Sequence, residues 1–177
     1  MTFHCQHQWL VLHCYTPRLH SIQTKPSLVI HLDCLLYTSF VDRLLSLTPG
    51  KEGVGEYRVR GDEYYLRGHL PGEPILPGVL LVEAGAQVAG MVAQEDPANP
   101  SLPRLKLTAL RGVKIFGSAR PGQTLIIEAT ITGRLGLMVQ AKVSASVSGV
   151  KVMTAELTLS GTAAASPAVA RSASSAR

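Results

Sequence analysis

A histidine and a glutamate flank a proline-rich turn, and both residue types can exchange protons during catalysis. His69 lies at the start of the turn, and Glu83 lies in the apolar run that follows it. Imidazole titrates near neutral pH, which suits a general base, while a carboxyl group among apolar side chains favours its protonated, donating form. The pair therefore indicates acid–base chemistry. A structural histidine and an internal ion pair are the alternatives.

The sequence around the pair predicts a loop followed by a buried helix. Pro71, Pro74 and Pro77 each fix φ and remove a backbone donor, so residues 69–77 should form an ordered loop. From Val79 to about Gln94 the prolines stop and the residues are apolar on nearly all sides. This composition is typical of a helix that is buried over most of its surface.

The predicted helix start offers further groups that could act on a substrate. The N–H of Gly78 is free at a helix N-terminus and could bind an oxygen that gains negative charge, and Val79 could supply a second N–H. A purely structural role for Gly78 in the turn is compatible with this one. Gln87 follows Glu83 by one helical turn, so it could orient that carboxylate.

The rest of the chain predicts a sheet. Residues 40–45 have apolar side chains at helical spacing, which favours a short helix or turn, and residues 55–60 alternate as a half-buried strand does. Four further runs rich in Val, Ile, Leu and Thr predict consecutive antiparallel strands joined by tight turns: residues 105–116, 124–134, 137–147 and 151–159. One long helix with such strands is an α+β pattern, in which the sheet wraps around the helix.

The run from Gly68 to Gln87 resembles the motif of the FabZ-type β-hydroxyacyl-acyl-carrier-protein dehydratases, roughly G-H-F-P-G-x-P-I-x-P-G-V-L-x-x-E-A-x-A-Q. Residues 40–45 resemble the family's F-x-V-D-R-V opening, and residues 112–125 resemble its K-x-R-F and P-G-D-x-L hairpin. The likeness covers roughly residues 38–160 and implies the hot-dog fold, a long central helix wrapped by an antiparallel sheet. The sequence departs from the family motif at three positions: Leu70 replaces Phe, Gly85 replaces a bulkier apolar residue and Gln123 replaces Asp. The first two bear on the acyl tunnel, so the motif does not define the preferred acyl chain length.

The resemblance implies a dehydration of (3R)-3-hydroxyacyl-acyl-carrier-protein to the trans-2-enoyl thioester, in fatty-acid or related biosynthesis. It implies that His69 of one subunit faces Glu83 of another across a homodimer, and that dimers often form hexamers. The substrate arrives on the phosphopantetheine of an acidic carrier protein, and no cofactor is expected. Four cations are candidate contacts for that carrier, with ordinary solvated charge as the alternative: Arg67, Arg111, Lys114 and Arg120.

Two other functions stay open on the sequence. One is an acyl thioesterase of the same fold, in which a carboxylate activates water at the thioester carbon. The other is a non-catalytic acyl-binding subunit. The intact set of His69, Glu83 and Gly78 with a Pro-Gly pair between the two titratable residues favours the dehydratase.

Length and composition indicate one domain. Of the 177 residues, we expect 38–161 to form the hot-dog dehydratase domain, 1–37 a poorly structured extension and 162–177 a disordered tail. The formal net charge of +5 suits an acidic partner, but scarce aromatic residues argue against nucleic acid. No apolar run is long enough for a membrane span, and no signal peptide is evident, so we expect the cytoplasm.

The first 37 residues hold most of the histidines and all three cysteines, Cys5, Cys14 and Cys34. These residue types bind zinc, but no correctly spaced pair of ligands is matched by a second pair. An odd number of cysteines also argues against a disulfide framework. We therefore expect neither a metal site nor a disulfide there.

Overall fold

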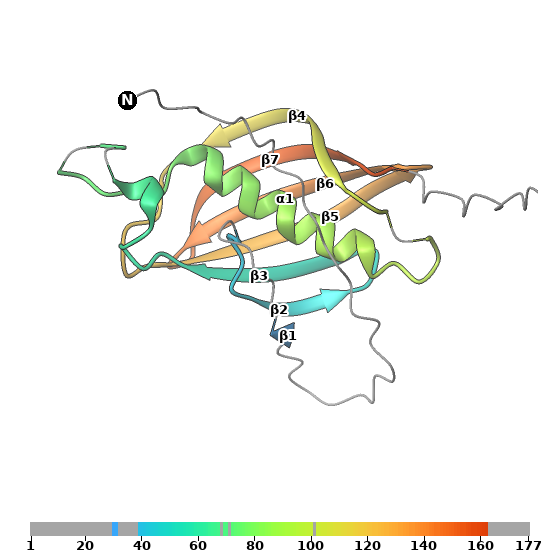
Figure 1. Cartoon of the computed structure of the whole chain (residues 1–177), viewed down its shortest axis with the longest axis horizontal. Coiled ribbons are helices and arrows are strands. Elements are labelled where there is room, and N and C mark those ends of the chain that lie inside the picture. The colour runs from blue at the N-terminus through green and yellow to red at the C-terminus, as the bar shows by residue number, and fades with distance from the viewer. Residues whose placement is uncertain (1–29, 32–38, 68, 71, 101, 163–177) are drawn as a thin grey trace, which may run out of the picture.

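In the described part of the chain, one long helix lies across one face of a curved antiparallel sheet (Figure 1). The computed structural model describes residues 30–31, 39–67, 69–70, 72–100 and 102–162. Its elements are β1 (Ile30–His31), β2 (Arg43–Thr48), β3 (Glu52–Arg58), the 3₁₀ turn η1 (Tyr64–Leu66), α1 (Gly78–Gln94), β4 (Lys106–Ile115), β5 (Thr124–Leu135), β6 (Met138–Val147) and β7 (Val150–Ser160). The prediction of an α+β hot-dog fold with one central helix is confirmed.

The helix begins and ends where the sequence predicts. Pro77 lies immediately before α1 in an extended conformation, and the N–H of Glu95 donates to the carbonyl of Met91 at the other end. Buried residues occupy most of α1, from Leu81 to Ala93, and they contact strands β3, β5, β6 and β7. Burial of this nearly all-apolar surface is the main stabilising term for the fold.

Glycines allow the helix to approach the sheet closely. A Cβ atom added at Gly85 of α1 would lie 2.9 Å from Cγ2 of Val143 in β6. On the sheet side, a Cβ at Gly53 would lie 2.7 Å from Cγ2 of Val92, and one at Gly55 would lie 2.9 Å from Cγ2 of Val88. The sheet therefore has glycine where helix side chains press into it, and the helix has glycine where a strand does.

The strand order is β1-β2-β3-β5-β6-β7-β4, and all neighbours are antiparallel. The hairpins β5–β6 and β6–β7 agree with the predicted meander, but the prediction that β4 also joins it is wrong. Strand β4 pairs with β7 at the far edge, so residues 116–123 cross to the other side of β7 and β6 before β5 begins. A sequence pattern fixes where strands lie along the chain but not which strand each one pairs with.

The predicted short helix or turn at residues 40–45 is also wrong, because β2 begins at Arg43 and pairs with β3. Phe40, Val41 and Leu44 are all buried, and this spacing fits a helix face. Leu44 is nevertheless buried while Leu45 is exposed, because neighbouring residues of a strand point to opposite faces. A short apolar run cannot distinguish the two structures by periodicity alone.

The predicted loop at residues 69–77 contains no helix or strand in its described part, and its backbone turns where Glu73 N–H donates to the carbonyl of Leu70 at 3.0 Å. Of the predicted N-terminal extension, Ile30 and His31 pair with β2 as strand β1. The three cysteines and the tail after Thr162 lie outside the described residues.

Arg134, at the end of β5, secures the C-terminal end of α1. Its guanidinium donates to the carbonyl of Ala93 at 3.3 Å and to that of Pro100, and it lies 3.5 Å from a carboxylate oxygen of Asp96. A cation at this end of a helix also complements the negative end of the helix dipole. Hydrogen bonds from the N–H of Ala98 and the amide of Asn99 lower the pKa of Asp96, with a smaller contribution from Arg134.

The close packing at Gly85 gives a stability prediction. Replacing Gly85 with Ala should lower the free energy of unfolding by about 1–3 kcal/mol, because Val143 is a stiff β-branched residue that cannot yield without moving β6. This cost should exceed the helix-propensity gain of about 1 kcal/mol. Urea unfolding measures the change.

The matched control is Gly90→Ala in the same helix, where the nearest atom to the added Cβ is Cδ2 of Leu105 at 3.5 Å, an ordinary contact. That variant should be as stable as the parent or more so. Equal effects of the two substitutions would contradict the packing argument.

Candidate active site

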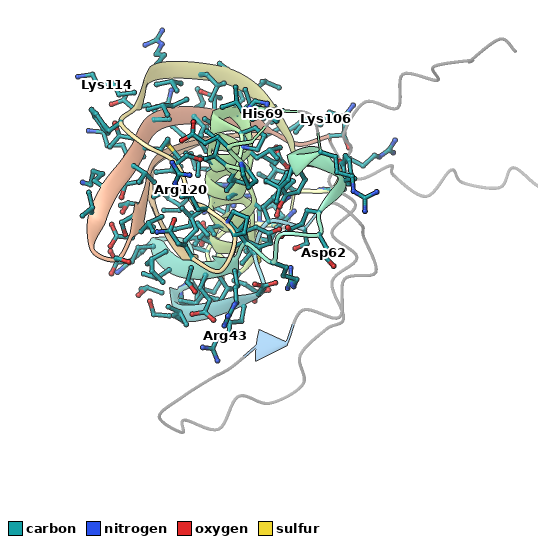
Figure 2. The ribbon with its side chains drawn as sticks, turned by 90° about the vertical axis from the view of Figure 1, so that its left-hand side faces the viewer. Arg43, Asp62, His69, Lys106, Lys114 and Arg120 are labelled. Atoms are coloured by element: carbon teal, nitrogen blue, oxygen red, sulfur yellow. The ribbon has the colours of Figure 1, made fainter. Side chains whose placement is uncertain are left out.

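Figure 2 is viewed onto the end of the molecule at which α1 begins, and of the predicted site residues it labels His69, Lys114 and Arg120 there. The loop before α1 is fixed there by the loop between β4 and β5. The N–H of Leu76 donates to the carbonyl of Ala119 at 2.8 Å, and the hydroxyl of Ser118 donates to the carbonyl of Leu76. Two segments far apart in sequence therefore set where the helix starts.

Glu83 and Gln87 are brought together as predicted. The amide nitrogen of Gln87 donates to Oε1 of Glu83 at 3.1 Å, and Oε1 of Gln87 accepts the backbone N–H of Phe40 at 2.8 Å. An N–H can only donate, so the bond to Phe40 fixes which end of the Gln87 amide faces Glu83. Gln87 is buried and Glu83 is half-buried, so this is the polar position on an otherwise apolar part of α1.

Gly78 is the first residue of α1, and β4 covers it from one side. A Cβ at Gly78 would lie 2.7 Å from Cδ1 of Ile115, so the absence of a side chain allows Ile115 to pack against the helix start. Val79 follows and is 73% exposed. Ile115 was not among the residues that the sequence singled out, because only the crossing of β4 brings it to Gly78.

His69 lies in an exposed turn before α1. Among the residues that the structure describes, no hydrogen bond or ion pair joins His69 to Glu83 of the same chain. The two candidate proton-transfer groups are thus placed separately within one subunit, one on the surface loop and one on the helix.

The four candidate carrier-binding cations do not form one cluster. Arg111 and Lys114 lie on the edge strand β4, with Lys114 directed away from the body of the molecule in Figure 2. Arg120 belongs to the loop after β4 and forms an exposed ion pair with Glu73 at 2.5 Å. Arg67 is exposed just after η1.

A polar cavity of about 480 Å³ lies elsewhere, on the face of the sheet that α1 does not cover. Its lining includes Lys114, Glu128, Lys142 and Glu156 but neither His69 nor Glu83. Within the described part of the chain, no group of three or more His, Cys, Asp or Glu side chains could hold a metal ion. The described helices also include none that is long and apolar enough to cross a membrane.

Comparison with known proteins identifies the family. Residues 36–156 match the model of the FabA-like domain, so the chain belongs to the FabA-like family. It is 37% identical over 117 residues to a 3-hydroxyacyl-[acyl-carrier-protein] dehydratase FabZ of Listeria welshimeri, which covers 66% of this chain and 81% of that protein. It is 40% identical over 113 residues to the FabZ of Acetivibrio thermocellus, covering 62% of this chain and 74% of the relative. The predicted family resemblance is confirmed, and so is the prediction that the chain is a dehydratase, a hydro-lyase.

Solved structures share the fold. The dehydratase heterocomplex ApeI:P of Xenorhabdus doucetiae matches with a TM-score of 0.60 at 16% identity, over 71% of this chain and 84% of that one. Zebra fish thioesterase superfamily member 2 matches with a TM-score of 0.54 at 16% identity, over 68% and 80% of the two chains. At these identities the likeness extends to the fold alone, which dehydratases and thioesterases share.

The bond between Gln87 and Phe40 can be tested by stability. Replacing Gln87 with Leu should lower the free energy of unfolding by about 1–3 kcal/mol, because the buried N–H of Phe40 loses its acceptor. Gln140→Leu, at an exposed position of β6, is the matched control and should change stability little. If both variants unfold at the same denaturant concentration as the parent, Gln87 does not anchor residue 40.

Proposed function

We propose that this chain removes water from a (3R)-3-hydroxyacyl group carried on the phosphopantetheine of acyl carrier protein and yields the trans-2-enoyl thioester. The relatives named FabZ support the substrate class. The observation that carries the proposal is Glu83, a carboxylate on a buried apolar helix, held by Gln87 near the end where the His69 turn meets the helix. Placing a carboxylate among apolar side chains costs free energy, so its presence there points to a function.

The reaction needs three groups, and each has a candidate. Neutral His69 takes a proton from the carbon next to the thioester carbonyl, while the N–H groups of Gly78 and Val79 stabilise the negative charge that develops on the carbonyl oxygen. Protonated Glu83 then donates its proton to the departing hydroxyl, and water leaves as the double bond forms. Because Gln87 donates to Oε1 of Glu83, the transferable proton belongs on Oε2. None of these steps calls for a metal or redox cofactor.

A homodimer would complete the site. Strand β4 lies at one edge of the described sheet. The exposed apolar residues of β4, together with Phe116 just after it and Val79 of α1, form a surface that suits a second copy of the chain; those of β4 are Leu110, Val113 and Ile115. Pairing of two such edges would cover this surface and bring His69 of one subunit toward Glu83 of the other. Assembly of dimers into hexamers and carrier contacts through Arg67, Arg111, Lys114 and Arg120 remain predictions of the family resemblance. A cytoplasmic location remains a prediction from the sequence, in which no signal peptide is evident.

The direct test offers 3-hydroxyacyl-carrier substrates of graded chain length to the purified protein. Formation of the enoyl thioester, followed by its ultraviolet absorbance and by mass spectrometry, supports the proposal and gives the chain-length preference. Release of free acid and carrier thiol instead would favour thioester hydrolysis, and tight binding with neither product would favour an acyl-binding subunit.

The proton-transfer roles predict the behaviour of two variants. His69→Ala and Glu83→Gln should each lower the dehydration rate by about 10²–10⁴-fold, because each removes a separate proton-transfer group. Thermal unfolding and size-exclusion chromatography check that both variants keep the parent fold and assembly. Near-normal turnover in either variant would remove that residue from the mechanism.

The shared site predicts that the two inactive variants rescue each other. After subunit exchange, a mixed dimer holds one site with both residues intact, so mixing His69→Ala with Glu83→Gln protein should restore part of the activity. Exchange itself is verified by mass spectrometry of differently tagged subunits. Verified exchange without recovered activity would favour a site built within a single chain.

A further inference from the structure

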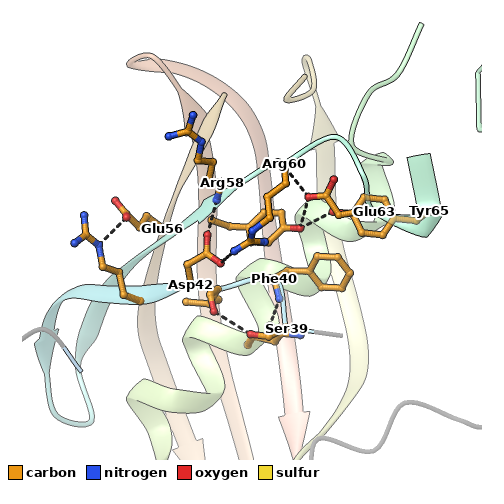
Figure 3. A network of polar contacts seen from close by, with 12 residues as sticks. Ser39, Phe40, Asp42, Glu56, Arg58, Arg60, Glu63 and Tyr65 are labelled. Carbon is orange, nitrogen blue, oxygen red and sulfur yellow. Dashed lines mark hydrogen bonds and ion pairs between the residues drawn. The ribbon is translucent and has the colours of Figure 1, made fainter. Parts of the chain in front are cut away.

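A connected set of polar contacts lies on the segment that leads to His69 (Figure 3). The carboxylate of Glu63 accepts the backbone N–H of Arg60 at 2.7 Å, the N–H of Gly61 at 2.6 Å and the hydroxyl of Tyr57 at 3.0 Å. Burial acts to raise the pKa of Glu63, but the hydrogen bonds from the backbone of this turn outweigh it, so the pKa is lowered overall. Glu63 is therefore ionised at neutral pH and ties the turn to β3.

Two tyrosines extend this contact. The hydroxyl oxygens of Tyr57 and Tyr65 are 2.6 Å apart. Since the proton of Tyr57 is donated to Glu63, the proton between the tyrosines must come from Tyr65. Burial raises the pKa of Tyr57 to about 12; the hydrogen bond from Tyr65 acts to lower this pKa, and Glu63 acts to raise it. Burial also raises the pKa of Tyr65. Both phenols keep their protons, so a directed chain runs from Tyr65 through Tyr57 to Glu63.

Phe40 joins this chain to the helix. Its ring packs edge-on against Tyr57 with centroids 5.8 Å apart and tilted against Tyr65 at 5.6 Å. Its backbone N–H is the group that Oε1 of Gln87 accepts, and Gln87 donates to Glu83. One residue therefore contacts both the tyrosine pair and the partner of the candidate acid.

We propose that Glu63, Tyr57 and Tyr65 are positioning residues for the dehydration: they fix the η1 turn from which the chain continues to His69, and through Phe40 they fix Gln87 against Glu83. The inference rests on the function proposed above. In this role the set of contacts acts through His69 and Glu83 rather than on the substrate itself. The geometry of both proton-transfer groups then depends on one cluster in each subunit.

The rate measurement compares Tyr57→Phe and Tyr65→Phe with Tyr64→Phe. Tyr64 is 64% exposed in the same turn, and its hydroxyl has no hydrogen-bond partner among the described residues, so it controls for the chemical change itself. Loss of the Tyr57 or Tyr65 hydroxyl should lower kcat by about 10–100-fold with KM unchanged, because misplaced catalytic groups slow the chemical step more than they weaken binding. Tyr64→Phe should retain the parent kcat. If Tyr57→Phe does not fold, Tyr65→Phe, which removes only the outermost hydroxyl, decides the question.

A second measurement does not depend on turnover. The ring signal of His69 in the ¹⁵N-histidine NMR spectrum, assigned by its loss in His69→Ala, should shift in Tyr57→Phe and Tyr65→Phe and stay in place in Tyr64→Phe. A lower melting temperature with unchanged kcat and an unchanged His69 signal would overturn the proposal, since the cluster would then serve stability alone. If the wild-type protein does not dehydrate the substrate, the proposed function is refuted. The NMR signal of His69 would still decide whether Glu63, Tyr57 and Tyr65 position that residue.

Discussion

The short distance between α1 and the sheet is the constraint on which the rest of this structure depends. It is set by glycine on both surfaces, with Gly53 and Gly55 receiving valines of the helix and Gly85 receiving Val143 of the sheet. Bulkier residues at these positions would force the helix outward. Because Glu83 belongs to this helix, the apolar packing of α1 sets the height of its backbone above the sheet, and the hydrogen bond from Gln87 orients its carboxylate. Packed interiors yield little, so this height is well defined.

Within that packing, a short series of hydrogen bonds connects Glu83, Gln87 and the backbone of Phe40. Gln87 donates to Glu83 and accepts the main-chain N–H of Phe40. A backbone donor cannot change its protonation or turn away, so the amide of Gln87 has one stable orientation. The carboxyl group thus keeps one oxygen occupied and one available. The proposed role of Glu83 as a proton donor uses the oxygen that Gln87 does not contact.

The helix, the loop before it and the positions of most strands could be predicted from the sequence because each has a local cause. Prolines exclude helix from residues 69–77, and an apolar run without breakers gives α1. The pairing of β4 with β7 has no local cause, since it depends on which edge of the sheet is free. For the same reason the sequence pointed to Gly78 but not to Ile115, and to Gln87 but not to the backbone of Phe40. Glu63 carries no motif that distinguishes it from a surface acid, and only its fixed turn reveals the N–H groups that it binds.

The separation of His69 from Glu83 within one subunit follows from the same topology. His69 lies before α1 on a loop that the β4–β5 connection holds at the end of the sheet, whereas Glu83 is already embedded in the packed helix. The strand beside the helix start is β4, which exposes Leu110, Val113 and Ile115 and has no neighbouring strand on its outer side among the described residues. In the proposed homodimer, a second copy covers this edge and brings its own His69 toward Glu83, a contact that the described part of one subunit does not make.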